Sequence, residues 1–261
     1  MTGDPTYDPQ RRTDVPALVL LHGGGPGVDA ASNWASVRAG FDGGFRCLAP
    51  DLLGFGTQIA GTGGLNGPRA WALARARQVL DLLDRHGLDR VHLVGNSAAG
   101  GAAALALLSV APDRVGRAIV MGGAGTGPLP AAVPFYDNPT RRSMRATLGR
   151  LVADESVHGG LLDELTELRL KQALRPGAEA AFRSMFADVV GGPPPVDLTK
   201  ITTPVLALHG ERDRVQPVEV SERLAGALPH GRLHVVAGAG HWIHVDRPDE
   251  FTKLVGEFLS A

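Results

Sequence analysis

Ser97 lies where an apolar run changes into a stretch of small residues, in the segment VHLVGNSAAGG at 91–101. A tight turn from a strand into a helix leaves little room around such a serine, so small residues are needed two positions before and after it. Gly95 and Ala99 meet this need, although glycine is more usual at the second position. The pattern predicts a nucleophile elbow with Ser97 as the nucleophile. A competing interpretation is that Asn96 and Ser97 only cap the following helix.

A serine hydroxyl becomes a strong nucleophile only when a base takes its proton and a third group holds that base. Asp213 and His241 are the predicted acid and base, because each closely follows an apolar run that is typical of a buried strand. Taken singly, Asp213 could instead pair with an adjacent arginine, and a histidine beside a glycine is common. Three such residues at the ends of separate strands favour a catalytic triad. Glu211 and His244 are the competing acid and base.

A glycine-rich run, HGGGPG at 22–27, directly follows the first strong apolar run. Attack on a carbonyl creates an oxyanion, which requires preorganised N–H donors. The backbone amides of Gly24 and Ala98 are the predicted donors. A phosphate-binding loop is disfavoured because no Gly-Lys-Ser/Thr follows, and a plain flexible turn is the other interpretation.

The elements that position these residues follow from short apolar runs bounded by Gly, Pro or Asp, which predict buried strands of a parallel sheet. Between them, helical periodicity and a long run of small residues predict helices, so that the alternation indicates a doubly wound, mostly parallel α/β fold. The predicted strands are 17–21, 47–49, 91–94, 118–121, 205–208 and 233–236, and the predicted helices include 69–86, 98–110 and 161–174.

The alternation of strands and helices stops between residues 122 and 195, where mostly amphipathic helical segments lie between Gly- and Pro-rich stretches. We therefore predict a core of residues 1–124 and 196–261 and a helical insertion at 125–195. An insertion above the carboxyl ends of parallel strands covers the place where such sheets bind ligands, which predicts a lid. The alternative interpretation is a helical subdomain that only adds bulk, which the periodicity also allows.

Composition limits the classes of partner. The 261 residues carry a net charge of −1 without a basic run, which argues against nucleic acid and anionic membranes and favours a small-molecule substrate. No signal-like or membrane-spanning segment is evident, so we expect a cytoplasmic protein. Cys47, the single cysteine, is expected to fill the core, and the scattered histidines predict neither a metal site nor a cofactor. A homodimer or a larger homo-oligomer is compatible with the sequence.

Several motifs together resemble the meta-cleavage-product hydrolases of the α/β-hydrolase superfamily. The resemblance extends from about Val15 to the C-terminus. The motifs that carry it are HGGGPG at 22–27 followed by Ser32-Asn33-Trp34, Gly95-Asn96-Ser97, and Gly240-His241-Trp242.

The resemblance implies hydrolysis of a carbon–carbon bond in 2-hydroxy-6-oxo-dienoates, the products of extradiol ring opening of catechols. It also implies that Asn33 and Asn96 contact the polar end of the substrate, that Trp242 lines the pocket, and that Arg169 binds the substrate carboxylate as a bidentate partner. Alternative roles are helix capping for Asn33, simple burial for Trp242, and an ion pair of Arg169 with a nearby glutamate, Glu164 or Glu167.

The chain also departs from the family pattern. The family usually has a β-hairpin before the strand that carries the glycine-rich loop, and only about fifteen residues precede that strand here, which predicts a shortened N-terminal edge of the sheet. Ala98 and Ala99 replace a larger residue and a glycine. A carboxylesterase or lactonase acting on a neutral substrate, a non-catalytic small-ligand receptor and a biosynthetic cyclase are therefore the alternative functions.

Overall fold

A single parallel sheet organises the protein. The computed structural model describes residues 15–59, 63–124, 135–187 and 196–261. Six strands lie in the order β2-β1-β3-β4-β5-β6, and every pairing between the described strands is parallel, as predicted for a doubly wound α/β fold. The strands are β1 (Ala17–Leu21), β2 (Arg46–Leu48), β3 (Val91–Asn96), β4 (Val115–Met121), β5 (Val205–Gly210) and β6 (Gly231–Val236).

The two outer strands differ from the prediction of full burial. Every residue of β1 and β5 is buried. In the outer strands, by contrast, only Leu48 of β2 and Val236 of β6 are buried, and Val235 of β6 is 42% exposed. β6 has one neighbouring strand in the sheet, so part of its surface faces solvent. Apolar periodicity alone does not separate an edge strand from a central one, because both are rich in branched side chains.

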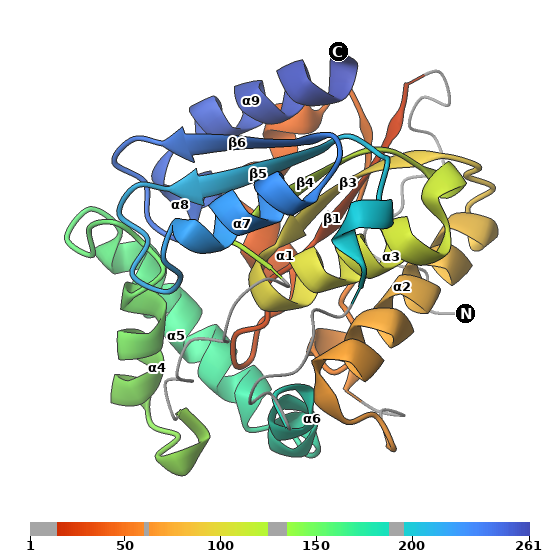
Figure 1. The fold of residues 1–261 in the computed structure, drawn as a ribbon. Helices are drawn as coiled ribbons and strands as arrows, with labels where there is room; N and C mark the ends of the chain where they lie inside the picture. The colour runs from red at the N-terminus through yellow and green to blue at the C-terminus, as the bar shows by residue number, and fades with distance from the viewer. Residues whose placement is uncertain (1–14, 60–62, 125–134, 188–195) are drawn as a thin grey trace.

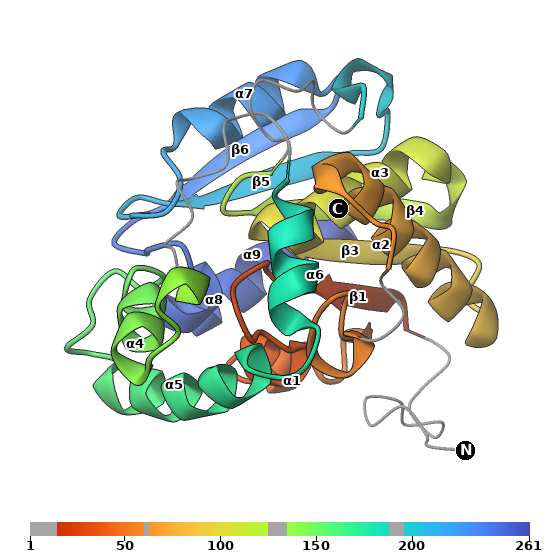
Figure 2. The same cartoon turned by 90° about the horizontal axis from the view of Figure 1, so that it is seen from below.

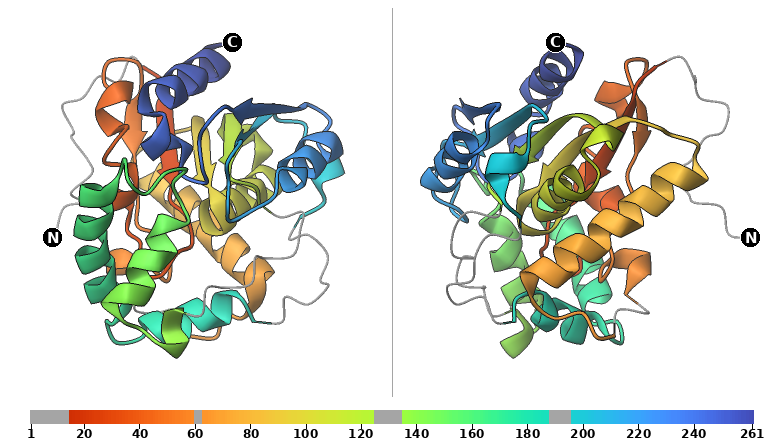
Figure 3. Two further views of the ribbon diagram at one scale, coloured as in Figure 1. Left: turned by 90° about the vertical axis from the view of Figure 1, so that its left-hand side faces the viewer. Right: turned by 45° about the vertical axis from the view of Figure 1, so that its right-hand side comes forward.

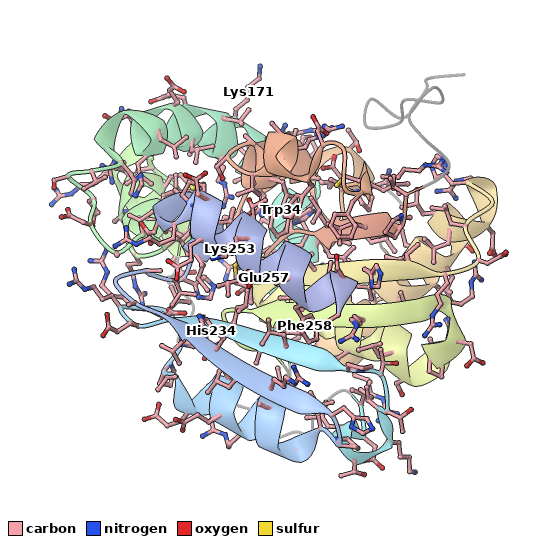
Figure 4. All side chains as sticks on the ribbon, turned by 90° about the horizontal axis from the view of Figure 1, so that it is seen from above. Trp34, Lys171, His234, Lys253, Glu257 and Phe258 are labelled. Carbon is pink, nitrogen blue, oxygen red and sulfur yellow. The ribbon has the colours of Figure 1, made fainter. Side chains whose placement is uncertain are left out.

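Helices cover both faces of the sheet (Figure 1). Val19 and Leu21 of β1 pack in a cluster with α2 (Gly67–Arg85), α3 (Ala102–Val110) and α7 (Glu219–Ala227). The alternate residues of the strand, Leu18 and Leu20, pack on the opposite side in a cluster with α1 (Ala30–Trp34) and α9 (Pro248–Ser260). Figure 4 shows this second side, with α9 lying across the sheet. Period-two alternation thus divides the core into two layers.

The longest helix, α2, has clear start and stop signals. Pro68 lies in its first turn, where a missing N–H costs nothing, and Gly87 follows its end with a φ of +60°. The helix runs across one face of the sheet (Figure 3). The prediction of a helix at 69–86 that ends at a glycine is therefore correct to within two residues.

The described residues between β4 and β5 form three helices, at the end of the molecule that the strands point towards (Figures 1 and 2). They share a small apolar cluster that also includes Trp242 from the loop after β6. Residues 125–134 and 188–195, the two ends of the predicted insertion, lie outside the described residues. The helices are α4 (Arg141–Gly149), α5 (Gly159–Ala173) and α6 (Ala178–Met185).

Short helical segments connect the larger elements. Among the described residues, no helix is both long and apolar enough to cross a membrane. Cys47 is only partly buried and packs against the cluster beneath α9, so its predicted role in the core is marginal. The segments are 3-10 turns at Arg38–Phe41, Gly56–Gln58, Pro112–Arg114, Phe135–Asp137 and Leu198–Lys200, and the short helix α8 (Ile243–Asp246).

Candidate active site

Ser97 occupies a strained turn. β3 ends at Asn96, and residues Ser97–Gly101 form a π-helical turn that continues into α3. With a φ of +54°, Ser97 is the only non-glycine among the described residues to have a positive φ. Such a conformation costs free energy and persists only where surrounding structure imposes it, as at a nucleophile elbow. The Asn96 side chain forms no capping hydrogen bond to this turn, so the helix-cap interpretation is not supported.

Close backbone contacts explain the small residues around the turn. A Cβ on Gly95 would lie 2.5 Å from the carbonyl oxygen of Gly100. A Cβ on Gly100 would collide with the carbonyl of Leu21, at the end of β1. Ala99 is buried, yet its methyl group has room beside the glycine-rich loop. The tight position is therefore Gly100, one residue beyond the position that the motif emphasises, which is why alanine is accommodated at 99.

Ser97, His241 and Asp213 form one hydrogen-bonded chain. The His241 Nε2 atom lies 2.8 Å from Ser97 Oγ, and His241 Nδ1 lies 2.7 Å from Asp213 Oδ2. Because an ionised carboxylate only accepts, Nδ1 carries the proton and Nε2 accepts from the serine hydroxyl. The side chains of His241 and Asp213 are each 2% exposed. This tautomer and geometry allow His241 to remove the Ser97 proton.

Asp213 is held on both of its oxygens. Its Oδ1 accepts hydrogen bonds from the backbone N–H groups of Val215 at 2.7 Å and Gln216 at 2.9 Å. Burial opposes ionisation, but attraction to His241 and these hydrogen bonds together hold the pKa of Asp213 below its usual value. The competing interpretation pairs Asp213 with Arg212 or Arg214. Of these two, Arg214 donates instead to the carbonyls of Gly149 and Val152.

The competing acid and base have other partners. His244 is fully buried, and its Nε2 lies 2.8 Å from the Asn33 carbonyl, so that this nitrogen is the donor. Burial lowers the pKa of His244 to about 3, which keeps the ring neutral. Glu211 accepts a hydrogen bond from the backbone N–H of Gly238, at the surface. Neither forms a described hydrogen bond with Ser97.

Gly122 was missed by the sequence reasoning. It directly follows β4 with a φ of +71°, and a Cβ there would lie 2.7 Å from His241 Cε1. Any side chain would therefore press on the imidazole. The signal available in the sequence is the Gly122-Gly123 pair at the carboxyl end of a predicted strand.

The glycine-rich loop packs against the serine turn. A Cβ on Gly24 would lie 3.3 Å from the Ala99 Cβ, and one on Gly23 would lie 3.6 Å from the Ser97 Cβ. His22 anchors the loop, because its Nε2 accepts the Leu52 N–H at 2.9 Å. Burial lowers the pKa of His22 to about 4, which leaves Nε2 free to accept at neutral pH. The loop thus brings the predicted donor Gly24 close to the turn that carries Ala98.

Among the described residues, Arg169 of α5 is buried and forms no ion pair with a carboxylate. It is 2% exposed, and its Nε and Nη2 atoms have no hydrogen-bond partner within the described part of the chain. Its guanidinium lies over the Trp242 ring at 4.9 Å, and a Cβ on Gly25 would lie 3.2 Å from Nη1. Burial lowers the pKa of Arg169 to about 10, opposed by Asp29, so it stays cationic at neutral pH. Glu167 pairs instead with Arg141, so the alternative ion pair of Arg169 with Glu167 does not form among the described residues.

Asn33 and Asn96 face one another. Asn96 Nδ2 donates weakly to Asn33 Oδ1 at 3.5 Å, and Asn33 Nδ2 and Asn96 Oδ1 have no partner among the described residues. Asn33 lies inside α1, whose cap is Asp29, so the capping role considered for Asn33 is wrong. Trp242 is 3% exposed and packs with the apolar cluster of α4, α5 and α6. This fits the alternative interpretation of Trp242 as a buried aromatic residue.

No group of three or more His, Cys, Asp or Glu side chains within the described ranges is arranged to hold a metal ion. The hydrogen-bonded Ser97, His241 and Asp213 can perform nucleophilic and acid–base chemistry. The hydrogen bonds that link Asp213, His241 and Ser97 allow the serine to act as a nucleophile, and the cationic Arg169 can bind an anion.

Comparisons with known proteins identify the family of this chain. The Alpha/beta hydrolase family matches residues 18–254. The chain is 38% identical to 2-hydroxy-6-oxo-2,4-heptadienoate hydrolase of Pseudomonas putida, over 94% of this chain and 89% of that protein. It is 35% identical to 2-hydroxymuconate semialdehyde hydrolase of a Pseudomonas species, over 93% and 86%.

A solved structure is similar along nearly its whole length. The 2-hydroxy-6-oxo-6-phenylhexa-2,4-dienoate hydrolase from Rhodococcus sp. superposes with a TM-score of 0.85 at 32% identity. The match covers 95% of this chain and 91% of that one. The resemblance found in the motifs therefore extends to the complete fold, and the chain belongs to the α/β hydrolase family of enzymes.

Proposed function

We propose that this enzyme hydrolyses the carbon–carbon bond between C5 and C6 of a 2-hydroxy-6-oxo-dienoate. Ser97 is the nucleophile, His241 the base and Asp213 the acid that orients it. Gly24 and Ala98 supply the oxyanion N–H groups. Similarity to dienoate hydrolases supports the substrate class, and the hydrogen-bonded Ser97, His241 and Asp213 support the mechanism.

The buried guanidinium of Arg169 is the observation that carries the proposal. Burying an ion without a partner is costly, so a protein retains such a group where a ligand completes its interactions. An ester with neutral substituents offers no counter-charge, whereas a dienoate offers a planar carboxylate that accepts two parallel N–H bonds. Arg169 therefore favours the dienoate over a neutral ester or lactone.

The two asparagines complete the polar end of the site. Asn33 Nδ2 is a donor and Asn96 Oδ1 an acceptor, and both are buried without described partners. A 2-hydroxyl or 2-oxo oxygen beside a carboxylate can use both, because the hydroxyl donates to Asn96 and the oxo group accepts from Asn33. This pattern suits a substrate that changes from the hydroxyl to the oxo form.

Cleavage begins with that change of tautomer. The proton on the 2-hydroxyl leaves and C5 gains a proton, which gives a 2,6-dioxo form without net change in composition. Ser97 Oγ then attacks C6 while His241 takes the hydroxyl proton, and the Gly24 and Ala98 N–H groups stabilise the resulting oxyanion. Without the first step the leaving group would be an unstabilised carbanion.

Collapse of this intermediate breaks the C5–C6 bond. The electron pair moves through C4 and C3 to the 2-oxygen, which receives the proton held by His241. The products of this step are a 2-hydroxy-2,4-dienoate and an acyl group on Ser97. Water then attacks the acyl group as His241 removes its proton, so that one water is consumed and a carboxylic acid is released.

Replacement of Arg169 by methionine tests the substrate class. Methionine retains length and apolar packing but removes the cation. We expect kcat/KM for a 2-hydroxy-6-oxo-dienoate, followed by loss of its absorbance, to fall about 300-fold because one partner of a desolvated ion pair is removed. Turnover of a p-nitrophenyl ester should change less than about threefold.

Arg141→Met is the matched control, since Arg141 is an exposed arginine on the neighbouring helix α4. It should leave both activities unchanged. Thermal unfolding of Arg169→Met should occur at the same temperature or higher, because an unpaired buried charge is replaced by an apolar group. Equal losses on both substrates would indicate a disturbed fold, and an unchanged dienoate activity would favour an esterase.

A further inference from the structure

His209, at the end of β5, is a buried histidine that the mechanism above does not use. Its ring is 1% exposed and makes two hydrogen bonds, with Ser221 Oγ at 2.8 Å through Nδ1 and with the Gln216 carbonyl at 3.1 Å through Nε2. The same Nε2 lies 3.6 Å from Asp213 Oδ2, the oxygen that binds His241. His209 and His241 therefore flank one carboxylate from two sides.

These contacts determine the tautomer of His209. A carbonyl oxygen only accepts, so Nε2 carries a proton and donates to Gln216. Burial lowers the pKa of His209, although Asp213 opposes the shift, which keeps the ring neutral at neutral pH. In a neutral ring Nδ1 must then accept, and the donor is the hydroxyl of Ser221, a fully buried residue of α7. Ser221 thus locks the ring with Nε2–H donating to Gln216, and this nitrogen lies next to Asp213.

Both backbone polar groups of Gln216 form hydrogen bonds in this arrangement. Its N–H donates to Asp213 Oδ1 and its carbonyl accepts from His209. The separation of 3.6 Å between Nε2 and Asp213 Oδ2 is too long for a good hydrogen bond, but the protonated Nε2 still lies close to the negative oxygen in a buried environment. The loop that carries Asp213 is therefore fixed from β5 and α7 together.

We propose that His209, locked by Ser221, is a positioning residue that orients Asp213 and partly offsets its charge. The inference rests on the proposed Ser97, His241 and Asp213 mechanism. The charged and titratable groups that act on His209 are Asp213, His241 and Glu219. Because the His209 N–H stabilises the carboxylate, its removal leaves a more basic Asp213, which binds the His241 imidazolium more strongly.

The test compares His209→Phe with His209→Gln. Phenylalanine fills the space without an N–H, whereas glutamine can still donate to the Gln216 carbonyl. The measured quantities are the rate of covalent labelling of Ser97 by a fluorophosphonate and the turnover of a chromogenic ester, each as a function of pH. We expect His209→Phe to lose about 10- to 50-fold in both, and His209→Gln to recover most of the loss.

The pH profile separates positioning from a simple structural role. In His209→Phe the acid limb of the profile should move to higher pH by about half a unit, because a more basic Asp213 holds the imidazolium more strongly. A loosened loop would weaken the bond between Asp213 and His241 and move the limb to lower pH. Ser221→Ala should move the acid limb in the same direction as His209→Phe, but by less. This second variant keeps the test valid if His209→Phe does not fold.

His234→Phe is the matched control, because His234 lies on the adjacent strand β6, paired in register with Leu208 (Figure 4). It should change neither rate nor profile. If the wild-type protein is labelled but the pH profile of His209→Phe is unchanged or moves to lower pH, the proposed role of His209 is overturned and the triad is left intact. Absence of labelling in the wild type would overturn both proposals.

Discussion

The two halves of the site differ in how completely their polar groups are satisfied. From Asp213 through His241 to Ser97, the donors and acceptors meet at 2.7 to 2.8 Å, and the carboxylate has two further backbone N–H partners. Around Arg169, Asn33 and Asn96, buried polar atoms lack partners among the described residues. The halves are adjacent in the chain and in space, since Trp242 follows His241 and stacks under Arg169.

This contrast indicates a division of labour. Groups that activate a nucleophile must be oriented before the substrate arrives, because reorganisation during the reaction raises the barrier. Groups that recognise an anion can remain unsatisfied until it binds, although their burial reduces the stability of the free protein. The satisfied half thus acts in the same way on any substrate, whereas the unsatisfied half selects which substrate binds.

Removal of the nucleophile should have the largest effect. Ser97→Ala should reduce turnover of both a dienoate and an ester on the order of 10⁴- to 10⁶-fold, as expected when one member of a cooperating set is lost. The melting temperature should change little, because only one hydrogen bond of the folded state disappears.

Ser156→Ala removes an exposed hydroxyl that bonds only to its neighbour Asp154 within the described chain, and it serves as the control. A Ser97→Ala enzyme with more than about a tenth of the wild-type rate would contradict the triad. In that case a ligand-binding role for the same site would become the better explanation.

Gly122→Ala should disturb the satisfied half without removing any of its groups. The new Cβ would lie 2.7 Å from His241 Cε1, and the φ of +71° adds backbone strain. We expect labelling of Ser97 to slow about 10- to 100-fold, because small displacements of a reacting group are costly. The stability should fall by about 1 to 2 kcal/mol.

Gly43→Ala separates strain from collision. Gly43 also has a positive φ, of +93°, but a Cβ there would meet nothing within 4 Å. It should show a similar loss of stability and a normal rate of labelling. Equal labelling rates in the two variants would mean that the imidazole tolerates displacement, and that the satisfied half is less rigid than its hydrogen bonds indicate.

The sequence predicted the sheet and the satisfied half well, for a physical reason. Strands that are buried on both faces are nearly continuous apolar runs, and Ser97, Asp213 and His241 follow such runs at the same edge of the sheet. Close contacts between distant segments were not predictable in this way. Gly122 beside His241 depends on how the end of β4 meets the loop after β6, which a single sequence does not specify. His209 lies only four residues before Asp213, but their contact depends on the shape of the loop after β5.

The unsatisfied half was the hardest to predict. Two carboxylates lie close to Arg169 along the chain, at Glu164 and Glu167, so the spacing allowed a surface ion pair as readily as a ligand site. Whether Arg169 forms a surface ion pair or a ligand site depends on which face of α5 is buried. Arg169 faces inwards with Leu162 and Leu165, whereas Glu167 faces outwards towards α4. Helical spacing gives the relative positions of these residues, but only packing selects the buried side.

Glu167→Ala should have the smallest effect and tests that assignment directly. The carboxylate is exposed and pairs with Arg141 at the surface, where solvent screens the interaction. We therefore expect no measurable change in dienoate kcat/KM and no shift in melting temperature beyond experimental error. If Glu167→Ala instead lowered dienoate turnover as Arg169→Met is expected to do, Glu167 would be acting on the guanidinium in solution. Arg169 would then belong to an ion pair, and the distinction between a satisfied and an unsatisfied half of the site would fail.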